Sequence, residues 1–530
     1  MTAFVERAPR TQRVVRRRIC VQGDLVLQTP AHLGSGDSDG PTDMSLLRDS
    51  VSEHALLTGA SLAGALRSYL RAYERGHAVE EQTQASFTSK GLAELLFGGR
   101  KGDDDGYQSP LIVADAFSGA PPAVELRDGV RINGTTRTPD PQGKYDLELL
   151  PAGTRFTLHF ELVVADLPRA VGGDLTAHTA YEAALREALM IALQGLSAGA
   201  IGLGMKKRRG FGRCSAEDWQ VWEFDMGDAD DVVAWLAFER GYGDSYYRPG
   251  ADLGALLHSS QPRAEAAPPI RLSATFALEG SVLIRSGQDV GAFGPDVRHL
   301  HALQPDGVER PVISGTALAG VLRHQAERIA NTLVAGSGLT FVDQLFGRVG
   351  QSGRKTGDPG QASRVAVHES VIVDARTDLV QSRVSIDRFT GGALDGALFS
   401  EQPAFAKPTT RVTLRIDLYP PEGVNLKALA PGSRSLGETQ AVAEIGMLLL
   451  ILKDLWTGEL AVGGEQSVGR GRLRGLSADL TVGKHTLATF AGDGAAVTLT
   501  AGDLKVLNDC VASIPTALRA LMEERSHDDR

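Results

Sequence analysis

The sequence has only three cysteines among 530 residues, and they stand far apart at positions 20, 214 and 510. No Cys-x-x-Cys pair occurs, which excludes a disulfide framework and a cysteine-rich zinc site. The longest apolar run, at residues 446–452, is too short to span a membrane, so we expect no membrane partner. The early arginines are not followed by an apolar stretch of the secretory type, and we therefore expect a cytoplasmic protein.

Basic residues are also fewer than acidic ones. The 55 Lys and Arg residues against 65 Asp and Glu residues give a net charge of −10. This balance excludes a uniformly basic nucleic-acid coat, although local basic patches remain compatible with it. Metalloprotease, serine-hydrolase, Walker and dinucleotide-binding motifs are absent. The apolar fraction of 42% is typical of a globular chain, and 61 glycines indicate many tight turns or close backbone approaches.

The sequence does contain an internal repeat. The segment Thr58–Arg67 recurs as Ser314–Arg323, 256 residues further along the chain. Three more pairs of similar segments follow in the same order, namely 95–98 with 345–347, 130–133 with 384–387, and 210–213 with 469–472. Because the period is far too long for a solenoid, the repeat predicts a tandem duplication of a whole domain.

Each copy shows the same order of predicted elements. Partial alternation of apolar residues predicts a first strand at 18–28 and at 271–283, and Ser61 is a candidate cap for a helix that ends near Glu74. A strand is predicted at 155–164, and helices are predicted at 179–196 and 445–456. The order strand, helix, strands, helix, strand predicts an α+β fold of two ferredoxin-like βαββαβ domains with long insertions.

The predicted boundaries divide the chain into five parts. They are a basic arm at 1–17, a first domain at 18–225, a linker at 226–268, a second domain at 269–485 and a C-terminal extension at 486–530.

These features together resemble the RAMP superfamily of CRISPR-associated proteins. The resemblance rests on the glycine-started helices at Gly59 and Gly315, the late glycine-rich basic loop, and the segment Asp43–Asp49, which fits an Asp-x-x-x-x-Arg-Asp pattern. The closer resemblance is to backbone subunits of type III effector complexes, which stack along a guide RNA. Two units in one chain resemble the double-unit subunits of type III-D complexes.

The resemblance implies which residues carry chemistry. Asp43, and Asp296 about one residue out of register in the second copy, are the implied catalytic and Mg²⁺-binding residues. The segment Ile386–Gly391 resembles the family's mid-domain motif that precedes a thumb-like hairpin, and the first copy degenerates there to Ile132–Thr135. Other aspartates in the same loops compete for the role, namely Asp37, Asp39, Asp49, Asp289 and Asp306.

Several residues are candidates for RNA contact. Gly59, Gly64, Gly315 and Gly320 allow close approach of a phosphate, and helix-start amides bind phosphate readily; the alternative is that these glycines only permit tight packing. The loop at 204–213 has five cations in eight residues, and Phe211 is a candidate for stacking on a base. The remaining candidates are Ser61, Arg67, Lys206, Lys207, Arg208, Arg209, Arg213, Thr316, Arg323, Arg388, Arg470 and Arg472.

The leading hypothesis is a type III effector subunit that binds CRISPR guide RNA and cleaves complementary single-stranded target RNA, in a complex with other effector subunits. A second hypothesis is a scaffold that binds RNA with one or both loops inert. A third is a metal-independent, guide-processing endoribonuclease with His32 or His301 as base, while His299 and His301 are otherwise expected to be solvated. The arginine-rich arm either clamps RNA or a neighbouring subunit, or forms a basic tail.

Overall fold

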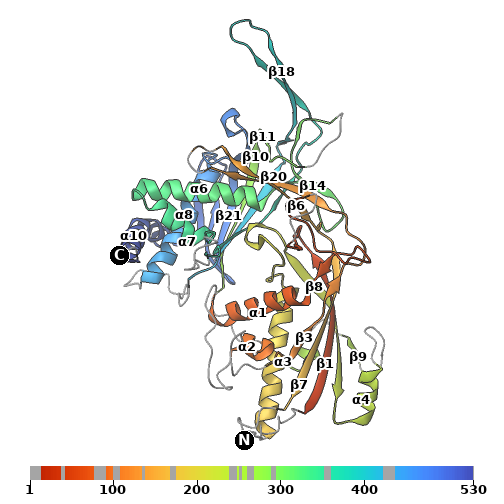
Figure 1. Cartoon of the computed structure of the whole chain (residues 1–530). Helices are drawn as coiled ribbons and strands as arrows, with labels where there is room; N and C mark the ends of the chain where they lie inside the picture. Colours follow the sequence, from red (N-terminus) through yellow and green to blue (C-terminus); the bar gives the residue numbers. More distant parts are fainter. Residues whose placement is uncertain are drawn as a thin grey trace, which may run out of the picture.

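The computed structural model describes residues 14–528 with the exception of 37–41, 77–90, 100–107, 134, 135, 137, 167–174, 238–246, 250–252, 260–267, 288–293, 351–359 and 422–435. The chain forms two α+β domains, and a long β-hairpin projects from the second (Figure 1). The tandem organisation predicted from the repeat is therefore confirmed. No helix in the described ranges is long and apolar enough to cross a membrane.

The first domain is built on an antiparallel sheet around β1 (Val15–Leu27). This strand pairs with β7 (Arg155–Ala165) on one side and with β8 (Cys214–Asp225) on the other. β3 (Leu111–Val113) and β9 (Tyr247–Pro249) complete the order β3-β7-β1-β8-β9. The first four strands have the order of a ferredoxin-like sheet, as predicted.

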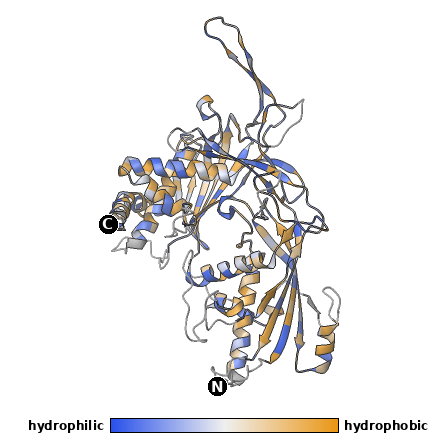
Figure 2. Ribbon diagram, viewed as in Figure 1, coloured by the Kyte–Doolittle hydropathy of each residue, from blue (hydrophilic) through white to orange (hydrophobic). Residues whose placement is uncertain are grey.

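Helices α1 (Gly59–Arg75) and α3 (Leu175–Ser197) pack together against this sheet. In α1, Leu62, Leu66 and Leu70 are fully buried at helical spacing. Along β7 buried residues alternate with residues that are exposed or partly exposed. Figure 2 shows that the strands of this sheet are largely hydrophobic. The shorter elements are α2 (Leu92–Phe97), β2 (Leu56–Leu57) and β4 (Ala116–Phe117).

The second domain repeats this architecture. β10 (Ile270–Glu279) lies between β20 (Arg411–Leu418) and β21 (Arg472–Val482), and β16 (Ser370–Val373) continues the sheet beyond β20. The covering helices are α6 (Gly315–Leu333), α7 (Gly338–Phe346) and α8 (Leu436–Trp456). The remaining short strands are β11 (Ser281–Val282), β12 (Val297–Arg298), β13 (His301–Leu303), β14 (Glu309–Ile313), β15 (Val365–Val367) and β19 (Ala404–Phe405).

Each domain carries a β-hairpin inserted before the third strand of its core sheet. In the first domain β5 (Glu125–Ile132) pairs with β6 (Pro139–Leu149), and in the second β17 (Gln381–Ile386) pairs with β18 (Ala393–Gln402). The second hairpin extends away from the rest of the molecule (Figure 1). The predicted mid-domain motif at 386–391 forms the tip of this hairpin and does not precede it, which corrects that expectation.

Two segments differ from their predicted roles. Part of the expected linker forms α4 (Ala229–Leu236), β9 and α5 (Leu253–Leu256), and these pack on β8 as additions to the first domain. The C-terminal segment adds two strands to the second sheet and two helices against α8, which explains why α8 is apolar around most of its circumference. These elements are β22 (His485–Ala491), β23 (Thr498–Gly502), α9 (Leu504–Ala512) and α10 (Ile514–Asp528).

Candidate nucleic-acid interface

Asp43 and Asp296 occupy equivalent places in the two domains. The amide of Asp43 donates to Asp146 Oδ1 at 2.8 Å, and the amide of Asp146 donates back to Asp43 Oδ2 at 3.0 Å. In the second domain the amide of Asp296 donates to Ser400 Oγ at 3.1 Å, while the amide and hydroxyl of Ser400 donate to Asp296 Oδ2 at 2.6 and 3.0 Å. Each loop aspartate is therefore fastened to a hairpin strand, β6 or β18.

The residues that follow these aspartates confirm the equivalence. Met44 forms a parallel bridge with Leu147, and Val297 forms the same bridge with Glu401. The apparent shift of one residue around Asp296 thus disappears in three dimensions.

Both loop carboxylates are exposed. The amide and hydroxyl of Ser400 lower the pKa of Asp296, since hydrogen bonds to an ionised carboxylate stabilise it. In the first domain the amide of Asp43 likewise lowers the pKa of Asp146. A carboxylate with a lowered pKa therefore lies at the base of each hairpin, Asp146 of β6 in the first domain and loop residue Asp296 in the second.

A groove of about 620 Å³ lies beside Asp43 in the first domain. It runs between the Asp43 loop, the first turns of α1 and the loop that follows α3. Predicted residues from three separate parts of the sequence meet there, since Asp43, Ser61, Gly64 and Lys207 all line it. The corresponding hollow of the second domain, about 580 Å³, lies further along α6 and includes Arg472 but not Asp296.

The start of α1 is already occupied by the protein's own side chains. Asp115 Oδ1 accepts from the Gly59 amide at 2.7 Å, and Thr58 Oγ1 accepts from the Ser61 amide at 3.2 Å. A carboxylate at this position also repels phosphate. The expectation that these amides bind RNA is corrected, because N-caps satisfy them.

The four candidate glycines divide into two kinds. A Cβ added at Gly59 would lie 2.2 Å from the Val113 carbonyl oxygen, and one at Gly315 would lie 2.3 Å from the Arg209 carbonyl oxygen. These two glycines are required for packing, which was the alternative interpretation. Gly64 and Gly320 are exposed, and no atom lies within 4 Å of an added Cβ. They remain candidates for close approach of a phosphate backbone.

The two helix arginines have a structural role. Arg67 donates to the carbonyl of Gly98 at 3.1 Å, and Arg323 donates to the carbonyl of Gly347 at 2.9 Å and to Asp343 at 2.6 Å. Gly98 and Gly347 are the C-caps of α2 and α7. These contacts hold the ends of neighbouring helices, so the expectation that both arginines point to RNA is corrected.

The basic loop of the first domain contains a short 3-10 helix, η3 (Lys207–Arg209). Lys206 precedes it in the left-handed region at φ 56°, and its ammonium donates to the Tyr145 hydroxyl at 2.8 Å. The guanidinium of Arg208 lies 3.9 Å from the centre of the Tyr419 ring in the second domain. The Lys206 ammonium also lies 4.1 Å from the centre of the Tyr145 ring. Two of the predicted cations therefore contact aromatic rings of the protein, while Lys207 lines the groove.

The prediction that Phe211 stacks on a base does not agree with its surroundings. Phe211 is only 2% exposed and packs with Leu147 and Leu149 in a small apolar cluster. The ring has no free face for a base, because burying an aromatic side chain removes it from solvent on both sides.

Arg470, the counterpart of Phe211, is also buried. Glu401 accepts a hydrogen bond from its guanidinium at 2.7 Å, and Glu465 forms an ion pair with it at 2.9 Å. Arg470 therefore stabilises the base of the second hairpin, and its predicted contact with RNA is corrected.

Three other predicted arginines differ in exposure. Arg388 is exposed at the tip of the second hairpin, next to Phe389, whose ring is fully exposed. Arg472 is exposed in the groove along α6. Arg213 is partly buried, and burial together with the nearby Arg415 lowers its pKa. The hydroxyl of Thr316, a further candidate, donates within the helix cap.

The surroundings of the two histidines in the second domain indicate a structural role. His299 is completely buried; burial, with His301 beside it, lowers its pKa to about 3, so the ring is neutral. His301 Nδ1 lies 2.8 Å from the His299 carbonyl oxygen. The expectation that these two are solvated loop histidines is wrong for His299. His32 lies in the first groove, with Nδ1 2.8 Å from the Glu148 carbonyl oxygen.

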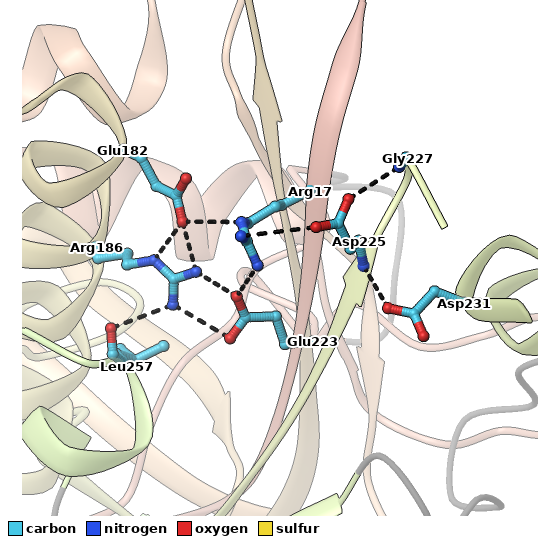
Figure 3. A network of polar contacts seen from close by, with 8 residues as sticks. All are labelled: Arg17, Glu182, Arg186, Glu223, Asp225, Gly227, Asp231 and Leu257. Atoms are coloured by element: carbon cyan, nitrogen blue, oxygen red, sulfur yellow. Dashed lines mark hydrogen bonds and ion pairs between the residues drawn. The ribbon is translucent and has the colours of Figure 1, made fainter. Parts of the chain in front are cut away.

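The described end of the basic arm is paired with acidic residues. Arg16 and Arg17 belong to β1, and Arg17 forms ion pairs with Glu182 and Glu223, which also bind Arg186 (Figure 3). Residues 1–13 of the predicted arm lie outside the described residues.

Two of the competing aspartates are engaged by neighbouring side chains of their own loops. Asp49 accepts two hydrogen bonds from Ser52, and Asp306 is paired with Arg310. Asp37, Asp39 and Asp289 lie outside the described residues.

The donor set at Asp43 fits a magnesium ion. Mg²⁺ is usually held by one or two carboxylates together with water and substrate phosphates. Asp43 and Asp146 place two carboxylates side by side, and each keeps one oxygen outside the reciprocal hydrogen bonds. In the second domain Ser400 replaces Asp146, so a single carboxylate remains. Within the described ranges no group of three or more potential metal-ligating side chains exists.

Sequence reasoning did not find Asp146 or Ser400. They lie 103 and 104 residues from the aspartates they bind, and no local pattern connects such distant positions.

The architecture and the paired sites define a class of protein: two fused ferredoxin-like domains, each with a projecting hairpin and a carboxylate at its base. A family model described as the RAMP superfamily matches residues 24–215 and, a second time, residues 275–474. The chain therefore belongs to the RAMP superfamily and contains two of its units. A comparison with curated proteins found no match. Membership makes the chain a CRISPR-associated, RNA-binding subunit of a defence system.

Proposed function

We propose that the chain is a backbone subunit of a type III-like effector complex, and that it cleaves target RNA paired to the guide at two positions. The observation that carries this proposal is the equivalence of Asp43 and Asp296 at the bases of two hairpins. A duplicated carboxylate in a duplicated position supports two like reactions on one substrate strand. Base pairing with the guide supplies sequence specificity, and the protein contacts backbone and shape.

The reaction uses the RNA's own nucleophile. The 2′-oxygen attacks the adjacent phosphorus as its proton is removed, and the bond to the 5′-oxygen breaks as that oxygen takes up a proton from water. The products are a 2′,3′-cyclic phosphate and a 5′-hydroxyl. Asp43 is placed to accept a proton or to hold a hydrated cation, because its side chain is exposed in the groove. A bound Mg²⁺ would stabilise negative charge on the phosphate. The two hairpins separate the substrate segments that reach each carboxylate.

The RNA path that best fits the structure runs along the first groove. Gly64 allows the backbone to approach α1, and Lys207 on the opposite wall supplies positive charge. In the second domain Gly320 and Arg472 are the exposed candidates. The net negative charge of the chain is compatible with this path, since acidic side chains such as Glu182 and Glu223 form ion pairs within the protein.

The scaffold alternative has one specific observation in its favour. Asp296 has Ser400 where Asp43 has a second carboxylate, so the second site has fewer oxygen ligands. If metal binding requires both carboxylates, only the first domain cleaves.

The test compares wild-type assembly with an Asp43→Asn/Asp296→Asn variant on guide-complementary RNA, with Mg²⁺ and with EDTA. Asparagine keeps an oxygen that accepts the hairpin amide, so the fold is preserved while the charge is lost. We expect unchanged RNA affinity and no metal-dependent cleavage. Asp49→Asn is a matched control in the same loop and retains cleavage. Undiminished cleavage by the double variant would place the nuclease in another subunit.

A further inference from the structure

The two domains of the chain contact each other through a loop of the first and a strand end of the second. The loop is the segment 206–210 around η3. The carbonyl of Arg209 packs on Gly315, and Gly210, at φ +91°, packs on Glu369, whose amide nitrogen would lie 2.6 Å from an added Cβ. The backbones of the two domains therefore pack directly against each other, and this packing requires glycine at both Gly210 and Gly315.

Opposite charges accompany this contact. Arg127 of β5 forms ion pairs with Glu369 of the second domain and, at 2.5 Å, with Glu125 of its own strand. Its side chain is only 4% exposed. Burial alone would lower the pKa of Arg127, but Glu369 and Glu125 more than offset this effect and raise it. A positive surface of the first domain thus meets an acidic position of the second.

The first domain carries its own copy of the acidic side of this contact. The carbonyl of Val113 packs on Gly59 as that of Val367 packs on Gly315, so Asp115 is the counterpart of Glu369. Asp115 is exposed, and the side chain of Phe117 is 47% exposed. We call residues 113–117 the receiving face.

The second domain has a copy of the donating loop. Its 3-10 helix η6 (Gln466–Val468) follows Glu465 at φ 58°, as η3 follows Lys206 at φ 56°. Val468 is 59% exposed, and no atom lies within 4 Å of a Cβ added at Gly469. The loop is shaped for the same contact and is uncovered.

The chemistry of this second loop is different. Neutral side chains at 466–468 replace the three cations at 207–209. Arg127 lies opposite Leu147 in the first hairpin, and Gln381 lies opposite the equivalent Glu401 in the second, so Gln381 replaces Arg127. The chain therefore keeps an acidic receiving face at one end, while the other end lacks counterparts of Arg127 and of the three cations of η3.

We propose that the receiving face of the first domain binds a different subunit, one that presents an arginine-bearing hairpin and a cationic loop, and that the chain's own second domain is excluded as that partner. Head-to-tail contacts between matched ends build open filaments, and opposite charges at the contact set which partners are accepted. The mismatch between its own ends prevents this chain from growing on itself. This inference rests on the domain contact and is independent of RNA cleavage.

The test restores the missing charge in the full chain. A Gln381→Arg/Ser467→Arg/Val468→Arg variant is compared with wild type by sedimentation velocity without RNA. We expect wild type to stay monomeric. The variant should self-associate at least about tenfold more tightly than wild type, and high salt should reverse this association. Adding Asp115→Asn keeps the acceptor for Gly59 and removes the charge, and we expect it to return the variant to monomer.

Two controls make the result decisive. The first adds three arginines at exposed positions of β23 and α9, outside the loop, namely Thr498→Arg, Ala501→Arg and Leu504→Arg. The second changes only Ser467 and Val468 to arginine, in case Gln381→Arg disturbs its hydrogen bond from Arg470. A folded variant that stays monomeric, equal association by the first control, or wild-type association that Asp115→Asn abolishes would overturn the inference.

Discussion

Removing the Arg127 guanidinium should loosen the contact between the two domains. The side chains of Arg127, Glu125 and Glu369 are 4%, 8% and 4% exposed, so Arg127→Ala leaves two buried carboxylates without a counter-charge. Breaking a buried ion pair from one side costs about 3–5 kcal/mol of folding free energy. A Met substitution combined with Glu369→Gln should recover much of this loss, because fewer buried charges then remain unpaired.

The penalty should also depend on pH. Burial already raises the pKa of Glu125, and Arg127 opposes this rise, so the pKa of Glu125 climbs further in the variant. A carboxyl group whose folded pKa exceeds its unfolded value destabilises the fold as pH rises through that range. The loss of stability should therefore be full at pH 7 and smaller at about pH 4, near the unfolded pKa.

Urea unfolding followed by tryptophan fluorescence measures this effect. Trp456 belongs to the second domain and the other three tryptophans to β8 and α4, so both domains are observed. Lys144→Ala removes an exposed ion pair with Asp128 from the same hairpin and should change little. A loss below about 1 kcal/mol for Arg127→Ala, or one that is equal at pH 4 and pH 7, would refute the reasoning.

Three further changes are predicted. Gly59→Ala should cost about 1–3 kcal/mol in thermal unfolding because its Cβ meets the Val113 carbonyl, whereas Gly64→Ala should be neutral or stabilising by up to about 1 kcal/mol; equal effects would contradict the division of the glycines. Wild-type stability should fall as pH drops from about 6.5 towards 3, by up to about 1.4 kcal/mol per pH unit, because unfolding frees His299 to bind a proton; His299→Leu should remove this slope in urea titrations. Phe211→Ala should cost about 3–5 kcal/mol of stability, with RNA affinity per folded molecule unchanged in filter binding; a selective loss of affinity would restore the stacking hypothesis.

The repeated domain could be predicted from the sequence because its markers are local. The helix starts at Gly59 and Gly315 combine a glycine with apolar residues at helical spacing, although the structure caps these helices with Thr58 and Ser314, so the prediction of Ser61 as a cap is wrong. Alternation along β1 and β7 likewise indicates strands whose order follows from the ferredoxin-like topology. The family assignment is confirmed for the same reason, while the type III-D subtype stays a prediction.

The roles of single residues could not be predicted in the same way. Composition marked Phe211 and Arg470 as candidates for RNA contact, but the hairpin strands that bury them lie at least 60 residues away in the sequence. Asp115, which accepts from the Gly59 amide, lies 56 residues from it in the sequence. Gly347, whose carbonyl accepts from Arg323, lies 24 residues from that arginine. A cation in a glycine-rich loop has the same local pattern whether it faces RNA or another domain, and only packing separates the two.

Mapping the cut positions on one end-labelled target RNA tests the central claim most directly. Wild type, Asp43→Asn and Asp296→Asn assemblies are compared side by side with Mg²⁺ present. If the two aspartates are equivalent catalytic groups, wild type makes two cuts and each variant loses a different one while the other persists. Two unchanged cuts in both variants, with RNA still bound, would contradict the account.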